Sequence, residues 1–329
     1  MNIVSFPQRL RLADWQALAA ERMAPLYADE VDRWQRLLDW DTTARWQDIE
    51  VRRRQGGAQG LAVVDDSGVV RGWCHYAVRD RVLRLDTFVT DEEAVAEMML
   101  DRLLSVPALA YIERVSAFLF SELSGLPQLL RFRGLSIDRY WYLGRELNTV
   151  APPALPAIRR WRPEDALATA ALLGRAYEPG AETRPFAPLG TPEQWLTYVN
   201  DVARGAHGTL LPDASFCLPA GPDRLSAVSL VTRIGENAAH LVQLVVDPAS
   251  RRRRIGQQLM DMATAGAART GCRRVSVIVG GSNRAARAFF DAARFRTMGS
   301  LLAAGTLQPR RATAAVSRPA TRTFASGRR

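Results

Sequence analysis

Apolar positions change their period along residues 240–295 and predict four consecutive elements. The run HLVQLVV at 240–246 predicts a strand, and QQLMDMATAGAA at 257–268 predicts a helix. In RVSVIV, 274–279, every second residue from Val275 onward is valine, as expected for a strand. The segment NRAARAFFDAARF, 283–295, then predicts an amphipathic helix, so strands and helices alternate in this part of the chain.

The same order of elements occurs earlier in the chain. The tripeptide RVS at 114–116 recurs at 274–276, an offset of 160 positions, and the predicted strand ends Val89 and Val246 are 157 positions apart. A nearly constant offset, with the elements in the same order, predicts a duplicated domain. The proline-rich segment APPALPAI at 151–158 predicts the linker between the two copies.

The segment VVDPASRRRRIG, 245–256, joins a predicted strand to a predicted helix. Such a turn leaves backbone N–H groups at the helix N-terminus without partners, and the helix dipole adds partial positive charge there. Four consecutive arginines add fork-shaped donors, so the segment favours binding of phosphate. A run of arginines is also typical of a solvated surface. Its position directly after VVDP favours the phosphate-binding interpretation over the solvated one.

This segment resembles motif A of the GNAT acyltransferase superfamily, in which Q/R-x-x-G-x-G/A follows a V-x-P turn. The tripeptide at 246–248 matches the turn, Arg251 the first motif position and Gly256 the last, whereas Arg254 replaces the first glycine. An arginine there with an α backbone conformation still presents its amide to a phosphate. The resemblance implies acetyl-CoA as co-substrate, bound by Leu244, Val245, Val246, Arg251, Arg252, Arg253, Arg254, Ile255, Gly256 and Gln257.

The following helix resembles motif B, N-x-x-A-x-x-F-Y-x-x-x-G-F. Two positions depart from it: Phe290 replaces the tyrosine often credited with protonating the departing thiolate, and Arg294 replaces the glycine. The general acid is therefore left open. The residues that this motif adds to the acetyl-CoA site are Asn283, Ala286, Phe289 and Phe290, and Phe295 matches the final position.

The resemblance implies an α/β (α+β) class fold, a tandem GNAT fold with two mixed, mostly antiparallel sheets, each flanked by helices. We expect a degenerate GNAT-like domain at 1–150 (the first half), a catalytic domain at 151–310 (the second half) and a basic disordered tail at 311–329. In the first half Asp91, Glu92 and Glu93 follow the fourth strand, where carboxylates repel pyrophosphate. The first half is therefore expected to shape the acceptor side of the second.

The resemblance further implies that the fourth and fifth strands separate and that an amine attacks the acetyl thioester directly. The amine must lose a proton, so a base or a water relay is needed. His240 and Glu236 are the candidate bases and Gln243 is a candidate for positioning water. Tyr177 is a candidate proton donor in place of the missing tyrosine. An ordinary structural role is the alternative for each of these side chains.

Composition narrows the function further. All 44 basic residues are arginine, so no lysine can serve as a nucleophile. The six arginines within 310–329 account for six of the formal +10 charges and leave +4 for the rest. Three scattered cysteines and three scattered histidines predict neither a disulfide framework nor a metal site, and they favour a cytoplasmic protein. No apolar run approaches about 18 residues, so no membrane contact is predicted.

The sequence thus predicts an N-acetyltransferase whose partner is a small-molecule or peptide amine. Nucleic acid is not expected as a partner, apart from a weak contribution of the basic tail. The layout also resembles that of mycothiol synthases, although no residue here indicates that substrate. Two alternatives stay open, an aminoacyl-type transferase, because Fem-type enzymes are also tandem GNAT folds, and a non-catalytic CoA-binding sensor or scaffold. The oligomeric state is open as well.

Overall fold

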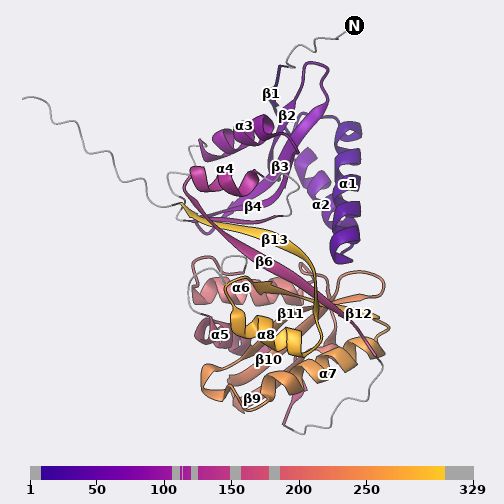
Figure 1. Cartoon of the computed structure of the whole chain (residues 1–329), viewed down its shortest axis with the longest axis vertical. Helices are drawn as coiled ribbons and strands as arrows, with labels where there is room; N and C mark the ends of the chain where they lie inside the picture. Colours follow the sequence, from indigo (N-terminus) through magenta and orange to yellow (C-terminus); the bar gives the residue numbers. More distant parts are fainter. Residues whose placement is uncertain are drawn as a thin grey trace, which may run out of the picture.

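A computed structural model gives the fold of residues 9–105, 112, 114–119, 125–148, 157–177 and 186–307. Two bodies of helices and strands lie one above the other, and two long strands, β6 and β13, run between them (Figure 1). The upper body comes from the first half and the lower one from the second half, as the colours follow the sequence. The predicted tail at 311–329 and most of the predicted linker lie outside the described residues.

In the first half, two helices follow the short first strand and precede the main strands. One helix then follows the fourth strand and another follows the fifth. In chain order these are β1 (Arg11–Ala13), α1 (Ala20–Leu38), α2 (Thr43–Arg54), β2 (Gln59–Val64), β3 (Val70–Arg79), β4 (Val82–Val89), α3 (Glu93–Leu104), β5 (Arg114–Leu119), α4 (Leu126–Phe132) and β6 (Leu135–Glu146).

Among the described residues, the second half repeats this order with one short extra strand and three 3₁₀ turns. Its elements are β7 (Arg159–Arg160), η2 (Pro163–Asp165), α5 (Ala166–Ala176), α6 (Pro192–Ala203), β8 (Thr209–Leu210), η4 (Pro212–Ala214), β9 (Phe216–Gly221), β10 (Arg224–Arg233), β11 (Ala238–Val246), η5 (Pro248–Ser250), α7 (Ile255–Arg269), β12 (Arg274–Gly280), α8 (Arg284–Ala292) and β13 (Arg296–Leu307).

The predicted offset between the halves is visible in these bounds. Strand β4 ends at Val89 and β11 at Val246, while β5 begins at Arg114 and β12 at Arg274. Short-range periodicity predicts these bounds, because the period of the apolar positions changes where a strand gives way to a helix. The domain boundaries at 150 and 310 stay a prediction.

The prediction of two separate sheets is wrong. The strands form one continuous 13-stranded sheet in the order β1-β2-β3-β4-β5-β13-β6-β12-β11-β10-β9-β7, with β8 beside β10. It is mixed, because β4–β5 and β11–β12 are parallel pairs and the other pairs are antiparallel. The halves share one sheet because β6, the last strand of the first half, is hydrogen-bonded to β12, and β13, the last strand of the second half, is hydrogen-bonded to β5.

This exchange is nearly symmetric. Strand β13 pairs with β5 from Leu302–Leu119 to Gly305–Ser116, and β6 pairs with β12 from Glu146–Arg274 to Tyr140–Gly280. The two exchanged strands also pair with each other along most of their length. Each long strand therefore has two ladder partners and neither half has a free edge at the junction, which removes an exposed edge of backbone groups.

The hydrophobic cores lie on both faces of the shared sheet. In the first half α3 and α4 cover β3 to β5, and in the second half α7 and α8 cover one face while α5 and α6 cover the other. A smaller cluster joins the halves, where Trp34 and Leu38 of α1 contact Tyr142 of β6 and Leu301 of β13. This cluster holds the first half against the strands that carry the site described below.

Candidate functional site

The site begins where β11 and β12 separate. The two parallel strands pair only from Ala238–Arg274 to His240–Ser276, and beyond His240 the edge of β11 that faces β12 has no strand partner. A cavity of about 100 Å³ opens there, which we call the splay cavity. It is lined by residues 241–244 of β11, residues 277–280 of β12, Asn283, Ala286 and Phe290 of α8 and its N-cap, and Tyr140, Tyr177 and Phe186.

The turn after β11 is fixed by a buried carboxylate. Asp247 caps the 3₁₀ turn η5, accepting the Ala249 amide at 3.1 Å, and it forms ion pairs with Arg175 at 3.1 Å and Arg224 at 3.5 Å. Burial alone raises the pKa of such a carboxyl group, but the Ala249 amide and the Arg175 guanidinium outweigh it and lower the pKa of Asp247. Asp247 therefore stays ionised and holds the loop.

The loop at 251–254 presents a row of unused amides. Helix α7 begins at Ile255, and its first backbone hydrogen bond runs from the Gln258 amide to the Arg254 carbonyl at 3.0 Å. Among the described residues, none of the amides of 252–257 has an acceptor. These six N–H groups lie at the positive end of the helix dipole, which is the arrangement that binds phosphate in other helix N-termini.

Two arginines of the loop have left-handed backbone conformations, Arg252 with φ 62° and Arg254 with φ 61°. The α conformation expected for Arg254 is thus the left-handed one, which glycine adopts without strain and which costs an L-residue roughly 1–2 kcal/mol. Alternation of right- and left-handed backbone angles turns successive amides toward one point and forms an anion-binding concavity. Arg254 thus has a backbone conformation that glycine adopts without strain.

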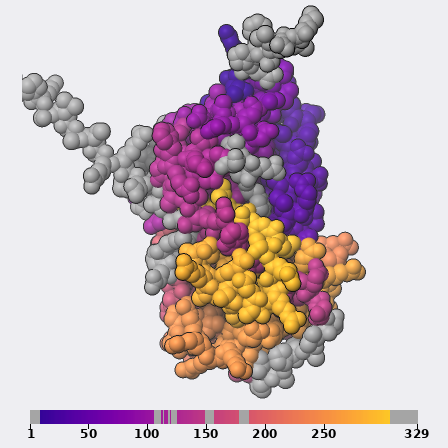
Figure 2. Space-filling view, in the orientation of Figure 1, coloured from indigo at the N-terminus to yellow at the C-terminus, as the bar shows by residue number. Residues whose placement is uncertain are grey.

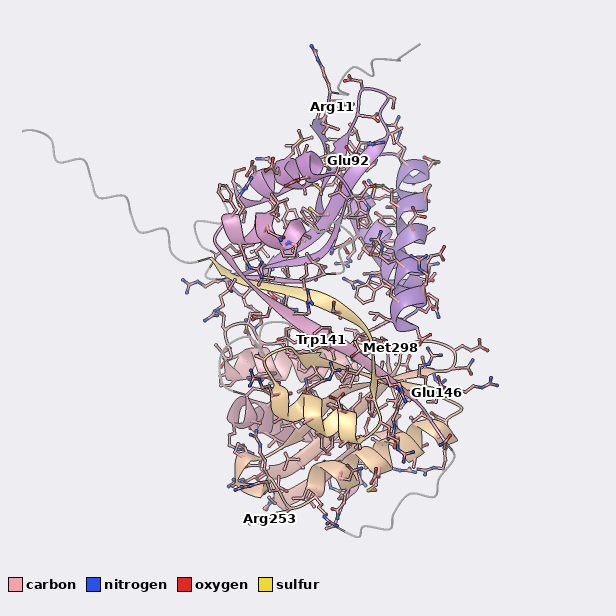
Figure 3. All side chains as sticks on the ribbon, viewed as in Figure 1. Arg11, Glu92, Trp141, Glu146, Arg253 and Met298 are labelled. Atoms are coloured by element: carbon pink, nitrogen blue, oxygen red, sulfur yellow. The ribbon has the colours of Figure 1, made fainter. Side chains whose placement is uncertain are left out.

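The arginine side chains of the loop divide into two kinds. Arg251 is engaged by the protein itself, donating to the Val246 carbonyl at 3.3 Å and the Ala176 carbonyl at 3.2 Å. The other three guanidinium groups are exposed and have no partner among the described residues, and Arg253 projects from the edge of the second half (Figure 3). They belong to Arg252, Arg253 and Arg254 and are available to phosphate oxygens.

At Gly256 the first turn of α7 packs against the end of β11 and against α8. An added Cβ at Gly256 lies 3.6 Å from Val246 Cγ2 and 3.9 Å from the Phe289 ring, so the first turn of α7 sits close to both elements. Helix α8 is capped by Asn283, whose Oδ1 accepts the Ala286 amide at 2.9 Å. The predicted residues Leu244, Asn283, Ala286 and Phe290 line the splay cavity. Ile255 and Gln257 lie in the first turn of α7, and Val246 packs with Ile255. Phe289 packs in the cluster of α7 and α8, whereas Val245 packs in the cluster of α5 and α6.

A short polar chain lies on the wall of the splay cavity. Tyr177 Oη donates to Gln243 Oε1 at 3.0 Å, and Gln243 Nε2 donates to Tyr198 Oη at 2.9 Å. Gln243 is buried, and burial also raises the pKa of Tyr198. The structure thus brings Tyr177 and Gln243, two of the three predicted catalytic residues, into one hydrogen-bonded chain.

His240 lies apart from the lining of the splay cavity, at the closed end where β11 and β12 still pair. Its Nδ1 is 2.9 Å from Ser276 Oγ, and Tyr142 Oη of β6 lies 2.6 Å from that same oxygen and 2.6 Å from the Leu38 carbonyl. Burial, together with the nearby His207, lowers the pKa of His240 to about 3, so the ring is neutral at physiological pH. His240 thereby links the two halves through a buried hydrogen-bond network.

One cavity residue, Tyr140, comes from the first half. It lies on the exchanged strand β6, opposite Gly280 of β12 and Leu301 of β13, and it is 2% exposed. The sequence alone did not indicate it, because its place in the cavity depends on the pairing of β6 with a strand more than a hundred residues away.

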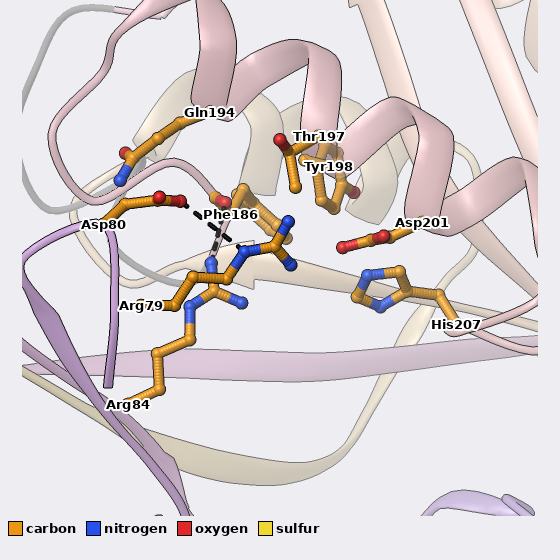
Figure 4. A pocket seen from close by; sticks show the side chains of 9 residues that line it. All are labelled: Arg79, Asp80, Arg84, Phe186, Gln194, Thr197, Tyr198, Asp201 and His207. Carbon is orange, nitrogen blue, oxygen red and sulfur yellow. Dashed lines mark hydrogen bonds and ion pairs between the residues drawn. The ribbon is translucent and has the colours of Figure 1, made fainter. Parts of the chain in front are cut away.

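A second pocket lies between the halves, close to the first. Arg79, Asp80 and Arg84 of the β3–β4 hairpin face Tyr198 and His207 of the second half, as Figure 4 shows. Arg84 Nη2 donates to the carbonyl of Phe186 at 3.4 Å, and Phe186 lines both pockets. Desolvation, with the charges of Arg84 and Arg45, lowers the pKa of His207 to about 4. The first half therefore forms part of the wall next to the splay cavity.

The equivalent turn of the first half has the opposite charge. Helix α3 begins at Glu93 with Glu92 as its N-cap residue, and the Thr90 hydroxyl accepts the Glu92 amide at 3.1 Å. The Glu92 carboxylate is paired with Arg71 at 2.6 Å. No arginine-rich loop lies between β4 and α3, since only three residues separate the two elements.

Comparisons with known proteins agree with this geometry. Residues 182–295 match the model of the acetyltransferase (GNAT) family. A GCN5-related N-acetyltransferase from Sphaerobacter thermophilus has 16% identity and a TM-score of 0.61 over 92% of this chain and 96% of its own. A tandem GNAT protein from the clavulanic acid biosynthesis pathway has 14% identity and a TM-score of 0.50 over 76% of this chain and 82% of its own.

A glucosamine N-acetyltransferase region of a fungal multi-domain GH3 β-N-acetylglucosaminidase has 13% identity and a TM-score of 0.61, and the match covers 92% of this chain but 38% of that one. Curated protein sequences give no match. At these identities the structures show the fold alone.

The match at 182–295 contains the separated strands, the arginine loop and α8. Residues 182–295 belong to the acetyltransferase (GNAT) family, whose members are acyltransferases. The family implies acetyl-CoA as the acyl donor and an acetyl acceptor as the second substrate.

Two further properties concern the described residues. None of their helices is long and apolar enough to cross a membrane. They contain no group of three or more His, Cys, Asp or Glu side chains that could hold a metal ion.

Proposed function

We propose that the second half transfers the acetyl group of acetyl-CoA to an amine of a small molecule or peptide by direct attack. The observation that carries this proposal is the row of six amides without acceptors at 252–257, placed at the mouth of the separated strands β11 and β12. A phosphate-binding turn beside an unpaired strand edge suits a ligand that has a pyrophosphate and a long arm with amide groups. Acetyl-CoA has both.

The residues fit that ligand in a definite order. The amides of 252–257 and the side chains of Arg252, Arg253 and Arg254 bind the pyrophosphate. The free edge of β11 at 244–246 pairs with the pantetheine arm as an added strand does. The thioester then lies in the splay cavity, where backbone donors of β11 polarise its carbonyl oxygen.

The acceptor reaches the thioester from the side where the halves meet. Tyr140 of the first half and Tyr177 of the second both line the splay cavity, and the pocket between the halves adjoins it through Phe186. The amine nitrogen attacks the carbonyl carbon, so a C–N bond forms, the C–S bond breaks, the nitrogen loses a proton and the thiolate gains one. Within the cavity Gln243 positions a water molecule that takes the proton from the nitrogen, and Tyr177 gives its proton to the thiolate and regains one from solvent.

The role of Tyr177 has a direct test. Tyr177→Phe removes the proton donor but keeps the ring that stacks on Trp195 at 5.5 Å, so kcat is expected to fall at least tenfold with little change in KM. Phe290 also lines the splay cavity, so Phe290→Tyr returns a phenol to it and is expected to recover part of the lost kcat. A double variant as slow as Tyr177→Phe, or a single variant with normal kcat, contradicts the assignment.

The overall function is tested by thiol release from acetyl-CoA across a panel of small amines and peptides. Gly256→Glu places a carboxylate beside the pyrophosphate and is expected to abolish both acetyl-CoA binding and thiol release. Circular dichroism checks that this variant is folded, because the added Cβ meets only ordinary contacts. Unchanged affinity in Gly256→Glu contradicts the assignment of the loop.

A second candidate function, a non-catalytic CoA-binding sensor or scaffold, is favoured by a single observation. Phe290 occupies the position at which the motif has tyrosine, and it is buried against Phe289 and Phe295. Stoichiometric acetyl-CoA binding without thiol release on any acceptor of the panel supports this candidate over the transferase.

A further inference from the structure

A groove of about 930 Å³ lies on the flank of the second half, between α7, the end of β6 and the start of β13. Glu146 and Met298, which line it, are labelled in Figure 3. It shares no lining residue with the splay cavity. Four arginines line this groove, and we call it the arginine groove; they are Arg145, Arg274, Arg294 and Arg296.

The acidic residues of the groove do not neutralise these charges. Glu146 accepts from Arg274 at 3.0 Å, and Arg274 is also paired with Asp39. Asp261 accepts from the Gln257 amide group at 2.8 Å. Among the described residues, the remaining three guanidinium groups form no ion pair at all; they are those of Arg145, Arg294 and Arg296.

Arg145 is held in place before any ligand arrives. Its Nη1 donates to the Ala293 carbonyl at 2.9 Å, and its guanidinium lies over the Phe295 ring at 5.3 Å. The Nε atom is buried and has no partner. A buried donor without an acceptor is costly, and an anion in the groove is a group that can satisfy it.

Arg294 is retained at a position that favours glycine. Its φ is 65°, and it lies just after the C-terminus of α8. The Arg294 amide donates to the Asp291 carbonyl at 3.0 Å, and the Phe295 amide donates to the Phe290 carbonyl at 2.9 Å. The equivalent residue of the first half is Gly134, with φ 85°. Strain of this kind persists where the side chain has a use, and the side chain of Arg294 lines the groove.

We propose that the arginine groove binds a small, multiply charged phosphate-bearing anion, which bridges Arg145, Arg294 and Arg296. Planar guanidinium groups match the oxygen pairs of phosphate. Of the three, only Arg145 interacts electrostatically with a carboxylate of the groove, that of Asp261, so the group suits a ligand with at least two negative charges. This site is distinct from the phosphate-binding loop of the acetyl-CoA site, because the two share no residue.

The probe is inorganic pyrophosphate, titrated calorimetrically into the full chain saturated with acetyl-CoA, so that the loop at 251–254 is occupied. We expect saturable binding of one pyrophosphate. Arg294→Gly and Arg296→Gln are each expected to weaken it at least tenfold, and Arg294→Gly is expected to unfold at a higher temperature than the wild type because it relieves the strained backbone. A fall in affinity without a loss of stability excludes misfolding as the cause.

The matched control is Arg269→Gln, which removes one exposed charge at the end of α7 and leaves the groove intact. Its affinity is expected to stay within twofold of the wild type. An equal loss of pyrophosphate affinity in Arg269→Gln and in Arg294→Gly would show that only net charge matters, and it would overturn the proposal. The absence of pyrophosphate binding to the wild type would overturn it as well. Binding of citrate as tight as that of pyrophosphate overturns the assignment to phosphate.

A titration without acetyl-CoA separates this site from the proposed acetyl-CoA site. Pyrophosphate binding that is lost in Arg294→Gly but kept in Gly256→Glu assigns the anion to the arginine groove. The reverse pattern assigns it to the loop and overturns the groove, whether or not the protein proves to transfer acetyl groups.

Discussion

Arg254 and Arg294 occupy two motif positions at which the family has glycine, and both have a positive φ. The backbone has kept the conformation for which glycine is suited, and the arginine side chain has been added to it. In the loop the addition brings a third exposed guanidinium beside the free amides, which favours phosphate. At single residues, therefore, electrostatic gain and backbone strain oppose each other.

We predict that Arg254→Gly stabilises the protein by about 1 kcal/mol, because glycine adopts φ 61° without strain. Acetyl-CoA affinity is expected to change less than about threefold, since the amide remains and two exposed arginines stay beside it. Urea unfolding measures the stability, and calorimetric titration measures the acetyl-CoA affinity.

Arg253→Gly is the matched control, because it removes the same charge from a residue that is not among those with positive φ. Glycine there adds only freedom to the unfolded chain, so this variant is expected to be less stable than the wild type. If Arg254→Gly is destabilised as much as Arg253→Gly, the left-handed conformation of Arg254 is not a source of strain.

His240 is the residue whose titration couples most directly to folding. Its pKa is about 3 in the folded protein and about 6.5 in an unfolded chain, so the unfolded state takes up the proton first. Its contribution to stability is therefore complete above pH 6.5 and is lost as the pH falls toward 3. Between pH 7.5 and 5.0 this loss amounts to about 2 kcal/mol for one proton.

We predict that His240→Gln is less stable than the wild type at pH 7.5, because the hydrogen bond to Ser276 is altered, and that the difference narrows by about 2 kcal/mol at pH 5.0. Urea unfolding of both proteins at the two pH values measures it. A difference that does not change with pH contradicts the low pKa.

The same variant decides the catalytic assignment of His240, which stays a prediction. A base at this position requires at least a tenfold fall in kcat in His240→Gln, or about 1.4 kcal/mol of transition-state stabilisation. A smaller fall leaves His240 with the structural role that its contacts with Ser276 and Trp40 describe.

At the scale of elements, the sequence predicted what depends on neighbouring residues. The strand before the loop ends at Val246 and the helix after it begins at Ile255, as the change of period indicated. The pairing of β6 with β12 was not predictable in this way, because a strand's alternation shows which face is buried but does not identify the strand beside it. One continuous sheet and the place of Tyr140 both follow from that pairing.

The exchanged strand predicts how fragments behave. A fragment of residues 157–307 lacks β6 and leaves β12 and β13 without their shared partner, whereas a fragment of residues 133–307 keeps it. We expect the longer fragment to unfold cooperatively and the shorter one to show no cooperative transition, by circular dichroism during heating. Equal melting curves would show that the second half is complete without β6.

At the scale of the whole molecule, the two halves place opposite charges at equivalent turns. After β11 the chain has the arginine loop and six amides without acceptors, whereas after β4 it has Asp91 and Glu92 directly before α3. Glu92 is bound to Arg71, so the charge of this nearby arginine is already paired. A helix N-terminus next to carboxylates repels a pyrophosphate that an arginine loop attracts.

We therefore predict that one acetyl-CoA binds per chain, and that the second half binds it. Calorimetric titration of the full chain is expected to give a stoichiometry near one, and Gly256→Glu is expected to reduce it to zero. Glu92→Gln is the control in the first half: it alters the equivalent turn, and the stoichiometry is expected to remain near one. A stoichiometry near two in the wild type would show that the first half keeps a site of its own, and binding that survives in Gly256→Glu would place the ligand outside the loop.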